Sequence, residues 1–170
     1  MRINIKKIAL CGMVAAIGIT LQLFFTHHIT FGGGTSVRIG FANFTMIFSG
    51  LAFGPIWGGI TAGIIDVVPA ILRPVGPINP GITASAVLTG VIPGLFYLRS
   101  KKFDNMTYLY FATGFTLLLT GGVITTYFLS IMFGAPFVYL LPPRLAVQAV
   151  MILFYPPLLA QLLKATRKFR

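Results

Sequence analysis

The sequence predicts an all-α integral membrane protein, a single bundle of six transmembrane helices. The composition carries the first part of this prediction, because 56% of the 170 residues are hydrophobic, only 9% are charged, and the mean hydropathy is +0.92. A soluble domain has about a quarter charged residues. The length fits one compact domain, residues 1–170, without a second. The single cysteine, Cys11, excludes an internal disulfide.

The second observation is a series of apolar segments, each close to the roughly 20 residues that cross a bilayer. A basic start followed by an apolar run is also typical of a signal peptide, but the later spans and the lack of a clear small-residue cleavage site favour a retained first helix. The stretch "FGPIWGG" leaves a tight turn after a short second span. The expected spans are residues 6–25, 39–53, 55–72, 80–98, 107–130 and 143–165.

Basic residues divide unevenly between the two ends of this bundle. An even number of spans places both termini on one side. Ten of the 13 Lys and Arg residues lie there, namely Arg2, Lys6, Lys7, Arg99, Lys101, Lys102, Lys164, Arg167, Lys168 and Arg170. The positive-inside rule makes this face cytoplasmic. It also accounts for the net charge of +11 better than nucleic-acid binding does, since no nucleic-acid motif accompanies the charge.

The remaining three arginines, Arg38, Arg73 and Arg144, fall on the opposite face, one in each external connection. A single arginine in such a place commonly extends to lipid headgroups. Each of these three adjoins Gly- or Pro-rich sequence, which favours a shared basic pocket. Such a pocket suits a ligand that carries a carboxylate.

Asp66 is the only acid within an expected span. An intramembrane carboxylate is costly unless it is paired, so Asp66 is either a functional residue or one half of a structural ion pair with Arg73 or Arg144. The adjacent His27 and His28 have no Cys, Asp or Glu nearby and are poor metal ligands. We therefore expect no metal site and no proton relay.

Three external segments break the helical pattern: "THHITFGGGTSVR", "RPVGPINPG" and "FGAPFVYLLPPR". Irregular backbone at membrane depth is tolerated only where protein buries it or water lines it. The segments could therefore form a lid and a ligand cavity on the extracellular side. Asn79, Thr83 and Ser85 would supply hydrogen bonds there. The nearby aromatic residues either stack on a ligand or anchor the chain at the membrane interface.

Small residues repeat at four-residue spacing along the first span, at Gly12, Ala16 and Thr20. Such a stripe allows close helix–helix approach, inside the bundle or with another protein. The sequence has no Walker motif, no nucleophile with a base partner and no metal cluster, which argues against an enzyme. No inverted repeat is visible, which disfavours a secondary transporter that works alone.

Three ordered segments, "VRIGFANFTMIFSGLAFGPIWGGITAGIIDV", "NPGITASAVLTGVIPGLF" and "PPRLAVQAVMI", resemble the substrate-binding S-components of energy-coupling-factor (ECF) vitamin transporters, most of all the folate-type branch. The resemblance covers the chain from Val37 to Ile152. It implies six helices and a vitamin site near the outer face, closed by the loop between the first two helices. It also implies an energising module of a transmembrane coupling protein and two ATPases, which bind the ATP.

In this family, small residues of the first helix contact the coupling protein, and here Gly12 and Ala16 match. The family also implies that the whole S-component topples in the membrane to deliver its ligand. Folate-type members usually show "PGFT" after an aromatic residue, whereas this chain has Asn79 and Ile82 in place of the rings. Fewer rings mean less stacking surface for a flat pterin. We therefore expect folate first, with pantothenate or another small vitamin as the alternative and a stand-alone channel or facilitator as a third.

Overall fold

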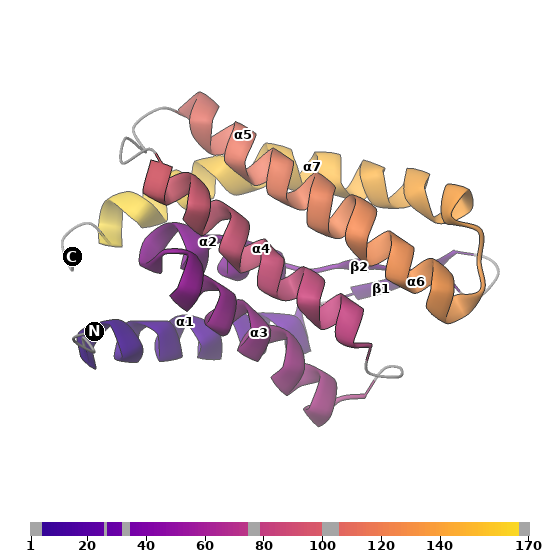
Figure 1. Ribbon diagram of the computed structural model, residues 1–170, viewed down its shortest axis with the longest axis horizontal. Helices are drawn as coiled ribbons and strands as arrows, with labels where there is room; N and C mark the ends of the chain where they lie inside the picture. Colours follow the sequence, from indigo (N-terminus) through magenta and orange to yellow (C-terminus); the bar gives the residue numbers. More distant parts are fainter. Residues whose placement is uncertain (1–4, 26, 32–34, 75–78, 100–105, 167–170) are drawn as a thin grey trace.

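Helices make up most of the computed structural model, which describes residues 5–25, 27–31, 35–74, 79–99 and 106–166. Their order and bounds are α1 (Ile5–Phe24), α2 (Ala42–Phe53), α3 (Pro55–Leu72), α4 (Pro80–Arg99), α5 (Met106–Leu117), the π-helix η1 (Leu118–Ile124), α6 (Thr125–Phe133) and α7 (Phe137–Thr166). Figure 1 shows α5, η1 and α6 following one another as one long rod beside α7. The start of α1 and the end of α7 lie at the same end of the molecule, together with the end of α4 and the start of α5 (Figure 1).

Within the described residues, five helical segments are long and apolar enough to cross a membrane: Lys7–Phe24, Pro55–Leu72, Pro80–Arg99, Met106–Phe133 and Phe137–Ala165. The chain is thus a multi-pass membrane protein. The expected second span, residues 39–53, is wrong in its length, because only the 12 residues of α2 are helical there. Twelve residues rise about 18 Å, well short of the hydrocarbon core of about 30 Å.

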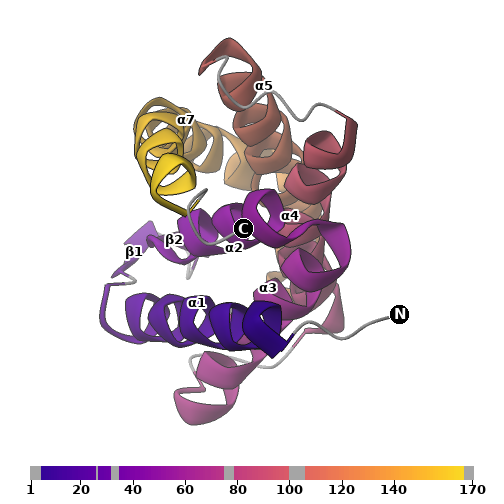
Figure 2. The same ribbon diagram turned by 90° about the vertical axis from the view of Figure 1, so that its left-hand side faces the viewer.

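The short helix α2 lies in the middle of the bundle, as the view along the molecule in Figure 2 shows. Nine of its twelve residues are buried. One side packs Ile47 and Leu51 against α5 and α7, and the other packs Met46 against α1 and α3. Protein rather than lipid therefore surrounds α2, so a helix too short to cross the bilayer is accommodated.

Glycines allow α2, α3 and α4 to approach one another closely. A methyl group on Gly50 or Gly90 would collide with a backbone carbonyl of the neighbouring helix, from Gly90 and Gly58 respectively. Gly54 joins α2 to α3 with φ +91°, a conformation that side chains with a Cβ rarely adopt. The positive φ of Gly54 therefore allows the chain to turn from α2 into α3 within "FGPIWGG" without a longer loop.

The first external connection is a β-hairpin rather than an irregular loop. Strands β1 (His27–Phe31) and β2 (Thr35–Ile39) pair antiparallel, with His27 opposite Ile39 and Phe31 opposite Thr35. The prediction of only helices missed this element. Short runs rich in Thr, Val, Ile and Phe on either side of glycines are the usual signal of a hairpin.

The third external connection is also more regular than predicted. Only residues 134–136 lie between α6 and α7, and the segment from Phe137 to Arg144 is helical. Pro142 and Pro143 lie inside α7. Each removes one backbone donor from the helix without ending it here. Arg144 is therefore a helical residue, and its predicted position in a loop is wrong.

Candidate functional site

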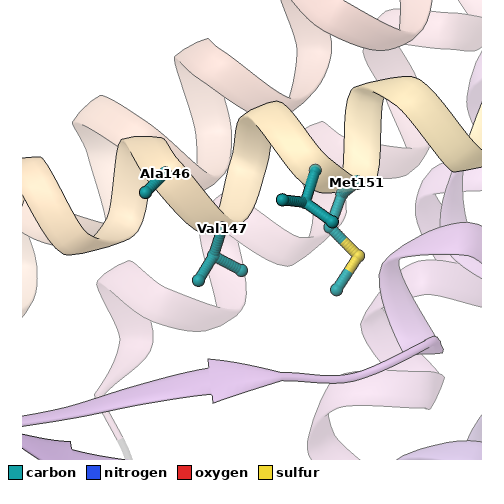
Figure 3. Close-up of a pocket in the computed structure, with 4 residues that line it drawn as sticks. Ala146, Val147 and Met151 are labelled. Atoms are coloured by element: carbon teal, nitrogen blue, oxygen red, sulfur yellow. The ribbon is translucent and has the colours of Figure 1, made fainter.

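A cavity of about 220 Å³ lies along α7 and is lined by Ala146, Val147, Val150 and Met151. Figure 3 shows Val147 and Met151 pointing from α7 toward a strand. The described lining is apolar. Pockets for drug-sized ligands usually measure about 300–1,000 Å³, so this cavity is small for such a ligand.

Two buried polar residues follow one another on the neighbouring face of α7. Arg144 is 7% exposed and Gln148 is 8% exposed. They are four positions apart, so they lie one above the other on the helix surface. Val147 and Met151, which line the cavity, flank Gln148 on the same helix. We call Arg144 and Gln148 the polar row of α7.

The π-helix η1 lies against this row and is held by hydroxyl groups from α4. Ser85 Oγ donates to the carbonyl oxygen of Thr120 over 2.9 Å and lies 2.8 Å from Thr125 Oγ1. Thr89 Oγ1 donates to Thr120 Oγ1 over 2.9 Å. The N–H of Thr125 also bonds the Thr120 carbonyl, which is the wide i→i+5 turn of a π-helix. Ser85, predicted to bind a ligand, is thus engaged in fixing η1.

Asn79 and Thr83, the other two predicted polar residues, lie where α4 begins. Asn79 Oδ1 accepts the N–H of Gly81 over 2.9 Å, which satisfies one of the donors at the start of the helix. Thr83 is partly exposed in the first turn. The structure gives Asn79 a capping role in addition to any contact with a ligand.

The predicted residues of α3 are on another side of the molecule, beside α1. Asp66 is buried, while Arg73 follows the last residue of α3 and is exposed. Arg73 Nη1 donates to the carbonyl oxygen of Leu23 over 3.3 Å, and within the described residues no ion pair joins it to Asp66. For Arg38, the structure describes the backbone, which pairs with His28; its side chain lies outside the described residues.

The small residues of α1 divide between two faces. Gly12 and Ala16 are exposed, and a methyl group on Gly12 would meet no atom within 4 Å. Gly18 instead faces the bundle, where a methyl group would overlap Ile65 of α3. The Gly12–Ala16 stripe is therefore not packed inside this chain. It presents a flat surface on the outside.

Sequence reasoning missed Gln148 as a candidate. The signal was present in "PPRLAVQAVMI", where the glutamine follows Arg144 at helical spacing. The expected span 143–165 contains both residues, but Arg144 was assigned to the external connection, so the two were not considered together as one helical face. Among the described residues there is no group of three His, Cys, Asp or Glu side chains that could hold a metal ion.

Comparisons with known proteins point to one kind of protein. The family described as "ECF transporter, substrate-specific component" matches residues 6–165. "Folate transporter FolT" of Clostridium novyi (strain NT) is 32% identical over 133 residues, which are 78% of this chain and 76% of that protein. The solved structure titled "Crystal structure of FolT bound with folic acid" superimposes with a TM-score of 0.78 at 30% identity, over 94% of this chain and 95% of that one.

Proposed function

The chain belongs to the family of substrate-specific components of ECF transporters, and we propose that it is the high-affinity folate-binding subunit of such an importer. The observation that carries the proposal is the similarity to FolT bound with folic acid, which extends over nearly the whole of both chains. The curated relative named as a folate transporter agrees with it. These similarities favour folate over pantothenate. They also favour a binding subunit over an enzyme.

The site along α7 has the chemistry that folate requires. Folate carries a flat pterin, a benzoyl ring and a glutamate with two carboxylates. Arg144 supplies a cation for a carboxylate, in a buried place where a charge-assisted hydrogen bond is strong. Val147 and Met151 supply an apolar wall for rings. Because the cavity of about 220 Å³ is small, we expect it to widen when folate enters.

The structure gives less support for ligand binding by the other two arginines and Asp66. Arg73 is exposed and bonds α1, so we assign it a mainly structural role. Asp66 is buried and stays a candidate for the site or for an ion pair. Asn79, Thr83 and Ser85 shape the end of α4 that lies against η1 and α6.

We propose that the partners are a transmembrane coupling protein and two ATPases. In this proposal the ATPases bind the ATP and this chain needs no cofactor. The exposed Gly12–Ala16 stripe is the contact surface for the coupling protein, because small residues let another helix approach closely. The subunit topples as one domain when the module turns over.

The orientation in the bacterial cytoplasmic membrane follows from charge. In the sequence, ten of the 13 Lys and Arg residues fall near the start of α1, between α4 and α5, or near the end of α7. The end of the molecule where these helix ends meet (Figure 1) is therefore cytoplasmic. The hairpin and α2 together then make the second of six crossings, and the cavity opens to the outside.

Calorimetry on the purified protein in detergent tests the function. We expect tight binding of folic acid and none of pantothenate at the same concentrations. In liposomes, the subunit alone should accumulate no folate, and uptake should require the coupling protein and the ATPases. Binding of pantothenate instead of folic acid would overturn the assignment of the vitamin, and uptake by the subunit alone would indicate a facilitator.

A further inference from the structure

Gln148 has a buried acceptor atom that the protein does not use. The side chain is 8% exposed, and its Oε1 has no hydrogen-bond partner in the part of the chain that the structure describes. Most buried polar atoms in proteins do have a partner. A buried acceptor without a partner costs free energy. A bound ligand that donates a hydrogen bond to this acceptor would remove that cost.

The position of this amide is fixed by η1. Gly121 of η1 lies directly against it, and a methyl group on Gly121 would collide with Gln148 Nε2. The preceding residue, Thr120, is held by Ser85 and Thr89 of α4. The wide turn and its glycine thus leave room for the glutamine amide between α7 and η1.

Gln148 also lies one helical turn from Arg144, which is the candidate partner of a carboxylate. In folate, the amide N–H that joins the benzoyl group to glutamate lies beside the α-carboxylate. A cation and a neutral acceptor at neighbouring positions match a carboxylate and a neighbouring N–H donor. Val147 and Met151 continue along α7 as an apolar surface for the aromatic part of the ligand.

We propose that Gln148 Oε1 accepts the benzoyl–glutamate amide N–H of folate while Arg144 binds a glutamate carboxylate. The polar row of α7 thereby recognises the glutamate tail. This inference rests on the proposed function and names a residue of the same site. It assigns Gln148 a specificity role, because a ligand without the amide leaves the acceptor unpaired.

The test is a cycle of two proteins and two ligands. Pteroic acid has the rings and a carboxylate but no glutamate, and so it lacks the benzoyl–glutamate amide N–H. Titrate wild type and Gln148→Met with folic acid and with pteroic acid by calorimetry. Methionine matches the size of glutamine without its polar atoms. We expect Gln148→Met to weaken folic acid by about tenfold and pteroic acid by less than twofold.

The matched control is Gln161→Met, the same substitution at an exposed position of α7, which should change neither affinity. A second variant, Gly121→Ala, displaces the Gln148 amide without removing it. It should also lower the ratio of folic acid affinity to pteroic acid affinity. It serves in place of Gln148→Met if that variant is not monodisperse.

The outcomes separate the two proposals. If wild type does not bind folic acid, the proposed function fails and the inference with it. If wild type binds folic acid but Gln148→Met and Gly121→Ala bind it equally well, the inference alone is overturned. An equal loss for folic and pteroic acids overturns it too, because Gln148 would then touch a part that both ligands share.

Discussion

Tyr155 Oη donates a hydrogen bond to the carbonyl oxygen of Gly40 over 3.0 Å, across 115 residues of sequence. Gly40 follows the last residue of β2, so the bond ties α7 to the end of the hairpin. The tyrosine ring is fully buried and meets Phe44 edge to face, with ring centroids 5.5 Å apart. One side chain of α7 therefore fixes both the hairpin and the start of α2.

Replacing Tyr155 by Phe tests this connection. The ring and its packing stay, but the Gly40 carbonyl loses its partner, at a cost of about 1 kcal/mol. The midpoint of thermal unfolding in detergent should fall by about 2–4 °C. Tyr127→Phe, at an exposed position, is the control and should leave the midpoint unchanged. An equal midpoint for both variants would mean that the bond does not contribute.

Substitution of Arg144 should reduce folate affinity more than substitution of Arg73. A charge-assisted hydrogen bond contributes about 1.5–3 kcal/mol, so Arg144→Ala should weaken binding about 10- to 150-fold. Arg144→Lys should recover only part of this, because lysine lacks the planar fork. Arg73→Ala, which loses its bond to Leu23 on the surface, should stay within threefold. Calorimetry on monodisperse samples checks this, and a larger loss for Arg73 would reverse the assignment.

The stripe on α1 should affect transport and not binding. Gly12→Leu adds a branched side chain to an open surface, so the isolated subunit should fold and bind folic acid as before. Uptake in the complete complex should be lost, because the coupling protein can no longer approach closely. Met13→Leu places the same side chain at a neighbouring exposed position and should transport normally. Unchanged uptake by Gly12→Leu would show that the stripe faces lipid only.

Close helix packing makes Gly90 intolerant of a side chain. Gly90→Ala places a methyl group on the backbone of α3 and should destabilise the bundle by about 1–3 kcal/mol or more, through overpacking. We expect a lower unfolding temperature or aggregation on gel filtration. Gly114→Ala meets only ordinary contacts with Ile152 and should be tolerated.

Labelling with a membrane-impermeant thiol reagent checks the orientation. In a Cys11→Ala background, a cysteine at Ser100 should remain unlabelled from outside intact cells. A cysteine at Ala135, between α6 and α7, should label. The reverse pattern would place both termini outside.

The sequence by itself determined the membrane character and the order of the helices. Apolar runs of the right length mark α1, α3, α4 and α7 because a bilayer imposes that length on any helix that lipid surrounds. The distribution of basic residues predicts the orientation, because Lys and Arg are enriched in the cytoplasmic connections of membrane proteins. The class of protein came from three ordered segments that resemble one family, because together they cover most of the chain from Val37 to Ile152.

Tertiary structure alone decided which polar residues are buried together and which helices they join. Arg144 was expected in the third external connection, at the edge of the span 143–165, but α7 begins at Phe137 and the segment through both prolines is helical. The structure shows that Arg144 and Gln148 of this helix are both buried, which their spacing alone does not reveal. Ser85 and Thr120 lie 35 residues apart in sequence and meet only because α4 packs on η1. Residue spacing identifies the residues on one face of a helix once the helix is known. Contacts between two helices depend instead on how closely they pack, which small residues such as glycine determine.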